Sequence, residues 1–174
     1  GAVLFKTAAD NPTAAFTQDA ITSTPTDLTA ISSDMVEFEG ALIVSDSTDL
    51  NRLSTTWDNA WWITTLAQSA LTASIAHPLH VTKKTNLLVI GDSNKLHTID
   101  KNNNVKTSRV ILPAEFEIIW IRSTYDGTWI GARNKVNREA KSFYWDEFAE
   151  NYNRGYELKS DMTFAGVIKD GILH

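Results

Sequence analysis

The sequence has 174 residues, of which 43% are hydrophobic, with a formal net charge of -5 and no cysteine. A chain of this length and composition can bury the core of one ordinary domain. Its Lys and Arg residues are scattered among acidic ones, which argues against nucleic acid or an anionic membrane as a partner. No stretch reaches the roughly 20 apolar residues of a membrane helix, and the lack of cysteine excludes disulfides and thiolate chemistry.

An apolar run recurs along the chain, and each copy is expected to form a strand. "GALIVSD" at Gly40 is echoed by "NLLVIGD" at Asn86 and "DGTWIGA" at Asp126. "GAVLFKT" at Gly1 and a truncated "GILH" at Gly171 are further copies. Successive copies lie roughly 40 to 46 residues apart, which is the period of four-stranded propeller blades.

A second marker keeps the same phase. After each marked strand, a polar turn is followed by another strand that ends in a large apolar residue and Asp: Trp57-Asp58, Ile99-Asp100 and Trp145-Asp146. Polar turns such as "KNNN" at 101–104 can supply the positive φ values of tight hairpins. Two markers in phase predict a repeated unit.

Each unit is predicted to contain four strands. The strands before the markers are "DMVEFEG", "HPLHVTKK", "EFEIIWIRS" and "DMTFAGVIKDG", and the last strands of the units are "WWITTLA", "VKTSRVIL" and "YNRGYELK". We therefore expect an all-β protein, a β-propeller of about four repeats beginning near residues 1, 40, 86, 127 and 171, in one domain over 1–174. A sandwich or barrel also uses short strands but predicts no such echo. Residues 64–77 have helical spacing, with a loop insertion as the alternative.

These repeats resemble the β-propeller superfamily, with a blade period similar to that of WD-repeat, kelch and NHL proteins. Trp57-Asp58 and Trp145-Asp146 look like the WD-repeat signature, although the Gly-His dipeptide of that family is missing. "STYDGTW" at 123–129 resembles a compressed Asp box of sialidase-like propellers. The Thr-, Asn- and Trp-rich style is similar to virion propellers of tailed phages.

The two ends of the chain leave the ring incomplete. Either the strand at 162–169 pairs with residues 3–6 and closes a four-bladed ring, or the chain is a section of a larger propeller. We expect a section, because "GILH" duplicates a strand that the N-terminal region already supplies.

Asp residues recur at matching turn positions: Asp46 and Asp92 after the marked strands, and Asp58, Asp100 and Asp146 after the following ones. Recurrence predicts turn bracing rather than calcium binding or catalysis, because Asp carboxylates accept bonds from turn amides and catalytic residues usually occur once. His77 and His80 form "HPLH", where Pro favours an extended backbone that points the two rings apart. We therefore expect no metal and no cofactor.

Most Trp side chains should pack between blades, but neighbouring strand residues face opposite ways, so Trp61 or Trp62 is expected to be an exposed contact. We expect a non-enzymatic structural or binding module in an extracellular or virion assembly, such as a phage tail or capsid accessory. Its partners would be other protein chains or a glycan. The alternatives are a carbohydrate-active enzyme, a sialidase-like hydrolase or a lyase, and an intracellular interaction scaffold. Glu115 and Glu117 are one carboxylate pair that a glycosidase could use.

Overall fold

The structure, a computed structural model, describes residues 34–45, 50–55, 61–67, 71–72 and 77–157, together with four two-residue strands. Side chains are described for 34–45, 50–52, 71–72 and 77–157. All regular secondary structure in these ranges is β-strand, so the protein is all-β, as its composition predicted.

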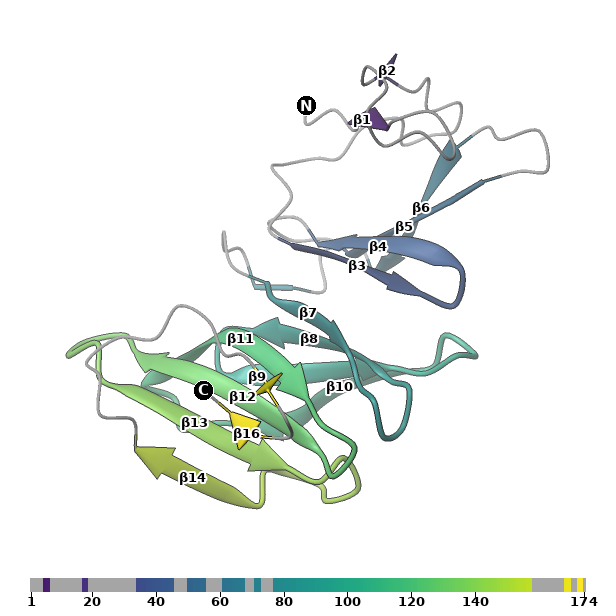
Figure 1. Cartoon of the computed structure of the whole chain (residues 1–174). Coiled ribbons are helices and arrows are strands. Elements are labelled where there is room, and N and C mark those ends of the chain that lie inside the picture. The colour runs from purple at the N-terminus through teal and green to yellow at the C-terminus, as the bar shows by residue number, and fades with distance from the viewer. Residues whose placement is uncertain are drawn as a thin grey trace.

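Three antiparallel four-stranded sheets make up most of the described chain (Figure 1). The first sheet contains β3 (Asp34–Phe38), β4 (Ala41–Ser45), β5 (Leu50–Thr55) and β6 (Trp61–Ala67). The second contains β7 (Leu79–Val81), β8 (Leu88–Asp92), β9 (Lys95–Ile99) and β10 (Val105–Ile111). The third contains β11 (Phe116–Ser123), β12 (Thr128–Asn134), β13 (Ala140–Trp145) and β14 (Arg154–Glu157). Strands pair in chain order within each sheet, which is the four-strand unit that the markers predicted.

Two further pairs of strands are short. β1 (Phe5–Lys6) pairs with β2 (Thr17–Gln18), and β15 (Ile168–Lys169) pairs with β16 (Ile172–Leu173). Among the described strands, β15 has no pairing with β1, so the ring-closing pairing is not observed.

The predicted markers stand at the turns that precede the second strand of each sheet. Gly40 directly precedes β4, Asn86 lies two residues before β8, and Gly127 directly precedes β12. The β3–β4 turn has two residues, Glu39 with φ 51° and Gly40 with φ 72°, which is the positive-φ pattern of a tight hairpin. Asn103, in the polar turn before β10, also has a positive φ of 62°.

The sequence has helical spacing over residues 64–77, but the first four of these residues form a strand and not a helix. Residues 64–67 belong to β6, which pairs with β5 through a register that includes Thr64 and Arg52. Leu71 and Thr72 are irregular, and 68–70 and 73–76 lie outside the described residues. The β-branched residues of "WWITTLA" fit a pleated strand better than a helix, so sheet pairing overrides the helical spacing at its start.

The second sheet lies between the other two and is buried on both faces. Leu88 and Ile90 of β8 pack in a core with residues of the first sheet, whereas Val89 packs in a core with residues of the third. Every residue of β8 is buried as a result. Alternate side chains of a strand point to opposite faces, so the continuous apolar run in "LLVIGD" reflects packing on both sides.

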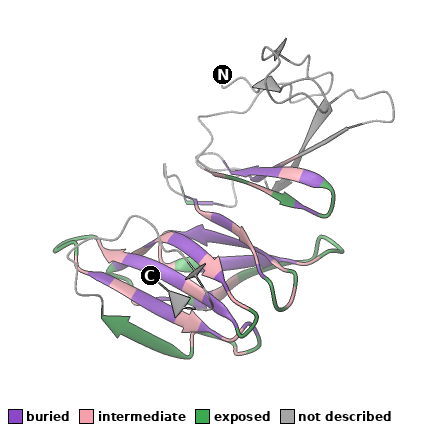
Figure 2. Ribbon diagram, in the orientation of Figure 1, coloured by how far each residue is buried: buried purple, intermediate pink, exposed green. Residues whose placement is uncertain are grey.

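The first strand of the second sheet contacts the first strands of the other two sheets, because β7 contacts both β3 and β11. At the other edge of the third sheet, its fourth strand β14 is exposed along its whole length (Figure 2). In the third sheet, β14 therefore forms an exposed outer edge.

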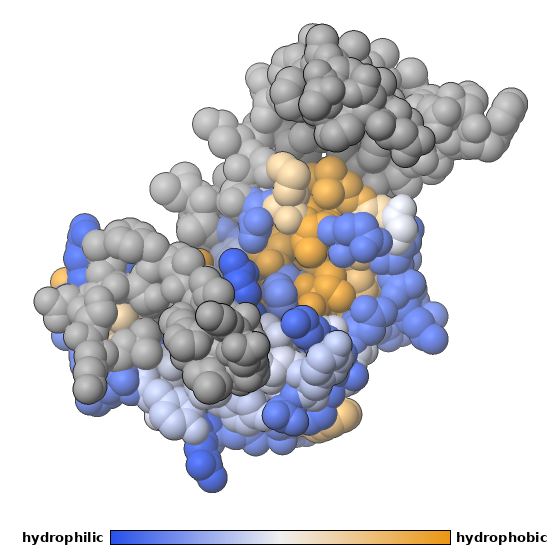
Figure 3. Space-filling view, viewed as in Figure 1, coloured by the Kyte–Doolittle hydropathy of each residue, from blue (hydrophilic) through white to orange (hydrophobic). Residues whose placement is uncertain are grey.

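Apolar residues gather over the junction of the first two sheets on the face seen in Figure 3, with hydrophilic residues beside them. Val36 of β3 and Val81 of β7 are partly buried against the core between these sheets. In the part of the chain that the structure describes, no helix has the length and apolar character to span a membrane.

Candidate functional site

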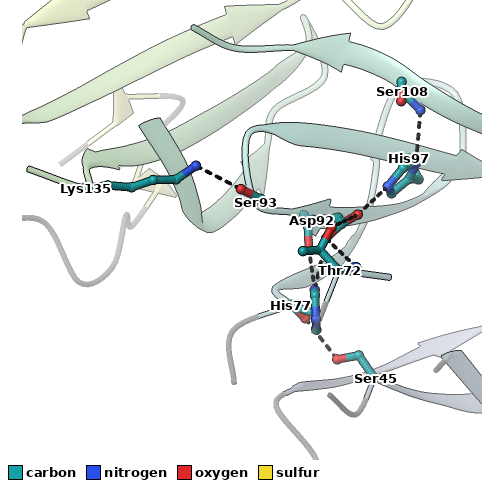
Figure 4. Close-up of polar contacts among 9 residues, drawn as sticks. Ser45, Thr72, His77, Asp92, Ser93, His97, Ser108 and Lys135 are labelled. Carbon is teal, nitrogen blue, oxygen red and sulfur yellow. Dashed lines mark hydrogen bonds and ion pairs between the residues drawn. The ribbon is translucent and has the colours of Figure 1, made fainter. Parts of the chain in front are cut away.

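A buried carboxylate of the second sheet, Asp92, ends β8 and is only 3% exposed (Figure 4). The backbone N–H of Thr72 donates to Oδ1 at 2.9 Å, and the Thr72 hydroxyl lies 3.2 Å from Oδ2. Nε2 of His97, on the neighbouring strand β9, lies 3.1 Å from Oδ2. Both carboxylate oxygens are thus occupied, as a buried charge requires.

The protonation of His97 follows from its neighbours. The backbone N–H of Ser108 donates to Nδ1 at 2.9 Å, so Nδ1 is an acceptor. Nε2 must then carry the proton of the neutral ring and donate it to Asp92. Because both ring nitrogens are committed, His97 has no lone pair left with which to take a proton from a substrate.

His77 extends this network to the first sheet. Its Nδ1 lies 3.1 Å from the carbonyl oxygen of Gly91, which can only accept, so Nδ1 is the donor. The hydroxyl of Ser45, at the end of β4, donates to the backbone oxygen of His77 at 2.9 Å. We call the group of Ser45, Thr72, His77, Asp92 and His97 the Asp92 network; it joins the first sheet to β8 and β9.

Hydrogen bonding decides the charge state of Asp92. Burial alone would raise its pKa, but the hydrogen bonds from His97 and from Thr72 outweigh burial and hold the pKa below its ordinary value. Asp92 is therefore an ionised structural acceptor at neutral pH.

His80 of β7 joins the second sheet to the third. Nε2 accepts the backbone N–H of Ser123 at 3.1 Å and lies 2.9 Å from its hydroxyl oxygen, which itself accepts the backbone N–H of Lys83. Burial, followed by the positive charges of Arg122 and Lys83, lowers the pKa of His80 to about 4, and Asp34 opposes them only in part. The ring is thus neutral at pH 7. Ser123 is only 2% exposed, so this Ser–His pair holds two strands together and presents no accessible nucleophile.

Glu147 provides a second bond between these sheets. It follows β13, has a positive φ of 73° and is 3% exposed. One carboxylate oxygen accepts the backbone N–H and the hydroxyl of Thr85, at 3.0 and 2.6 Å, and the other accepts the hydroxyl of Thr128 at 2.8 Å. Thr85 lies in the turn before β8, so this carboxylate spans the two sheets.

Two of the recurring Asp residues accept bonds from the turns that they begin. Oδ1 of Asp100 accepts the backbone N–H groups of Asn102 and Asn104, at 2.8 and 2.9 Å. Oδ1 of Asp146 accepts the corresponding groups two and three residues further on, at 2.9 and 2.8 Å. The side-chain amide of Asn104, which donates to Oδ2 at 2.9 Å, and then its backbone N–H lower the pKa of Asp100, and the backbone N–H groups of Ala149 and Phe148 lower that of Asp146. Asp46 and Asp58 lie outside the described residues.

The predicted contact residues Trp61 and Trp62 begin β6 and pair with Thr55 and Ser54 of β5. Their side chains lie outside the described residues, so the structure does not say which ring is exposed. Trp145 is fully buried in the core between the second and third sheets, where a large ring was expected. Trp120 is also buried, and its ring lies directly over Gly131 of β12.

The other residues weighed from the sequence lie apart. His77 and His80 enter different networks, in keeping with an extended "HPLH" segment. Glu117 of β11 forms an ion pair with Arg133 of β12, whereas Glu115 lies in the turn before β11. Within the described ranges, no group of three or more His, Asp or Glu side chains is placed to hold a metal ion.

Sequence reasoning missed Thr72, Thr85, Ser123 and Glu147, which bond to Asp92, His80 or one another across segments. None of these four residues stands at a repeated position, so the sequence repeat could not indicate that they bond between segments. No protein-family model matches this sequence, and no curated protein is detectably similar to it.

Proposed function

We propose that the chain is a section of a β-propeller that acts as a non-enzymatic binding or structural module in an extracellular or virion assembly. The observation that carries the architecture is the position of β7, which contacts both β3 and β11. Sheets stacked face to face with their first strands together and their fourth strands outward have the arrangement of blades around an axis.

The engagement of polar side chains favours binding over catalysis. Asp92 and Glu147 have both oxygens occupied, and the nitrogens that His80 and His97 could use as bases accept backbone N–H groups. A hydrolase of the sialidase kind would need several Arg residues converging on a carboxylate pair. Glu117 instead forms an ion pair with Arg133 of the neighbouring strand, which accounts for its charge structurally.

Exposed rings at one end of the sheets suit contact with a partner. Tyr125, in the β11–β12 turn, is 80% exposed, and Phe148, after β13, is 65% exposed. The ammonium groups of Lys83 and Lys84 lie 5.8 and 4.9 Å from the centres of these two rings. Rigid aromatic side chains of this kind commonly anchor protein interfaces.

The test measures the native assembly and the chemistry separately. Size-exclusion chromatography with light scattering of material from the native source should give a particle mass larger than that of the same polypeptide on a denaturing gel. A panel of fluorogenic glycosides should show no hydrolysis above buffer. A monomer in the native source, or turnover that is lost with substitution of Glu117, would overturn the proposed function.

A further inference from the structure

A small cavity with aromatic walls opens at the end of the third sheet, where β11 begins and β14 ends. Its volume is about 240 Å³, below the roughly 300 Å³ at which drug-sized pockets begin, so it suits a single side chain or a molecule of that size. Its lining consists of Pro113, Glu115, Phe116, Lys141, Phe143, Tyr152, Gly155, Tyr156 and Glu157.

The aromatic walls are held in fixed positions. Phe143 packs edge-on against Phe116, with ring centres 5.7 Å apart, and against Tyr152, at 4.9 Å. Gly155 faces Phe143 across the β13–β14 pair, and a Cβ there would lie only 3.2 Å from the ring. The missing side chain at Gly155 therefore leaves the Phe143 ring open to the cavity.

The protein already places a cation among these residues. The ammonium of Lys141 lies 5.4 Å from the centre of the Phe116 ring and 3.7 Å from a carboxylate oxygen of Glu157. An aromatic face and a carboxylate are the two groups that attract an ammonium ion. Lys141 thus shows the kind of group that the cavity accepts.

The charged residues that line the cavity have a net charge of one negative unit, which one further cation would balance. Glu115 and Glu157 contribute two negative charges to the lining, and Lys141 contributes one positive charge. The Glu115 carboxylate is exposed and makes no hydrogen bond or ion pair in the described part of the chain. The lining therefore carries one net negative charge.

We propose that this cavity binds a primary ammonium group on an alkyl chain, such as the lysine side chain of a partner protein, between its aromatic rings and Glu115. The proposal deepens the proposed binding function by naming the chemistry of one contact. A lysine chain offers an apolar stem for the rings and a charge for the carboxylate. The ammonium of Lys141 competes with the ligand for the aromatic rings and carboxylates of the cavity. Substitution of Lys141 therefore tests whether the ligand binds at this site.

The experiment is an NMR titration of the ¹⁵N-labelled full chain with N-acetyl-lysine methylamide. The matched probe is N-acetyl-norleucine methylamide, which has the same alkyl stem without the ammonium, and methyl glucoside tests for a sugar site. We expect saturable shifts of the amides around Glu115, Lys141 and Gly155 with the lysine probe alone. Equal binding of the norleucine probe, preferential binding of the glucoside, or the absence of saturable shifts would overturn the proposal.

Two substitutions should act in opposite directions. Glu115→Gln removes the net negative charge of the lining and should raise the dissociation constant about threefold, whereas Lys141→Gln removes the competing ammonium and should lower it by a similar factor. Glu150→Gln, an exposed carboxylate outside the lining, makes the same charge change as Glu115→Gln and should leave binding unchanged. If Lys141→Gln weakens binding, or Glu150→Gln acts like Glu115→Gln, the site is not the one proposed. None of these results bears on the size of the native assembly, which tests the proposed function separately.

Discussion

Nε2 of His97 lies 3.1 Å from Oδ2 of Asp92 while Nδ1 of the same ring accepts the backbone N–H of Ser108, so one neutral histidine bridges β8 and the bulged strand β10. The ring has a single tautomer in this position, because only Nε2 can donate. Asp92 in turn accepts the N–H and lies within hydrogen-bond distance of the hydroxyl of Thr72, so its carboxylate accepts from two segments, residue 72 and β9.

Replacing Asp92 with Ala should therefore destabilise the fold strongly. The change leaves the buried His97 Nε2–H without its acceptor and also removes the acceptor of the part-buried Thr72 N–H, which should cost about 2 to 4 kcal/mol of unfolding free energy. Urea denaturation followed by tryptophan fluorescence measures the loss. Asp100→Ala is the comparison, because Asp100 also accepts turn amides but its carboxyl is exposed; an equal loss in both variants would contradict a special role for the buried network.

The pKa of His80 predicts how stability depends on pH. Its folded value of about 4 lies below the ordinary value of 6.5, so the unfolded chain binds more protons between these two values. The contribution of His80 is fully present above pH 6.5 and is lost as the pH falls toward 4, a change of about 2 to 3 kcal/mol after allowance for partial exposure. Unfolding curves from pH 4 to 7 measure this slope.

His80→Gln is the matched variant for that measurement. A glutamine oxygen can accept the Ser123 N–H but does not titrate in this range. The variant should show a flatter dependence of stability on pH between 4 and 6.5. A wild-type profile that is already flat there, or an unchanged slope in the variant, would count against a neutral, bonded His80.

Gly131 and Gly40 should respond differently to alanine. A Cβ at Gly131 would overlap the buried Trp120 ring, and moving a packed ring typically costs about 1 to 3 kcal/mol or more. A Cβ at Gly40 meets no atom within 4 Å, so its cost comes only from the positive φ and should be about 1 kcal/mol. Thermal unfolding of Gly131→Ala and Gly40→Ala tests the order, and a greater loss at Gly40 would be the contrary result.

Trp61 and Trp62 test the proposed assembly. Neighbouring strand residues generally point to opposite faces of a sheet, so we expect only one of the two rings to be needed for the core. Replacing each with Ala in turn should give one variant that keeps its melting temperature but loses association, by on the order of 2 kcal/mol in binding. Co-sedimentation with the native assembly, paired with a melting curve, measures both effects. If both variants unfold, the hairpin is buried and the contact hypothesis fails.

The strand units could be predicted because hairpins are local. The markers at Gly40, Asn86 and Gly127 precede second strands, and Asp100 and Asp146 follow third strands, because turn residues and alternating side chains act over a few positions. The helical interpretation of residues 64–77 was wrong for residues 64–67, which form part of β6. Helical spacing of a few apolar residues does not outweigh pairing with a neighbouring strand.

The sequence by itself determined an all-β chain of four-stranded units, because pattern and turn chemistry are properties of neighbouring residues. The tertiary structure alone decided which polar residues meet between the sheets. Thr85 donates to Glu147 across 62 residues, and His80 bonds Ser123 across 43. The stacking of one sheet on the next decides which residues form such pairs. A buried acceptor can bond to a donor from any segment that packs against it, so no spacing in the sequence predicts the pair.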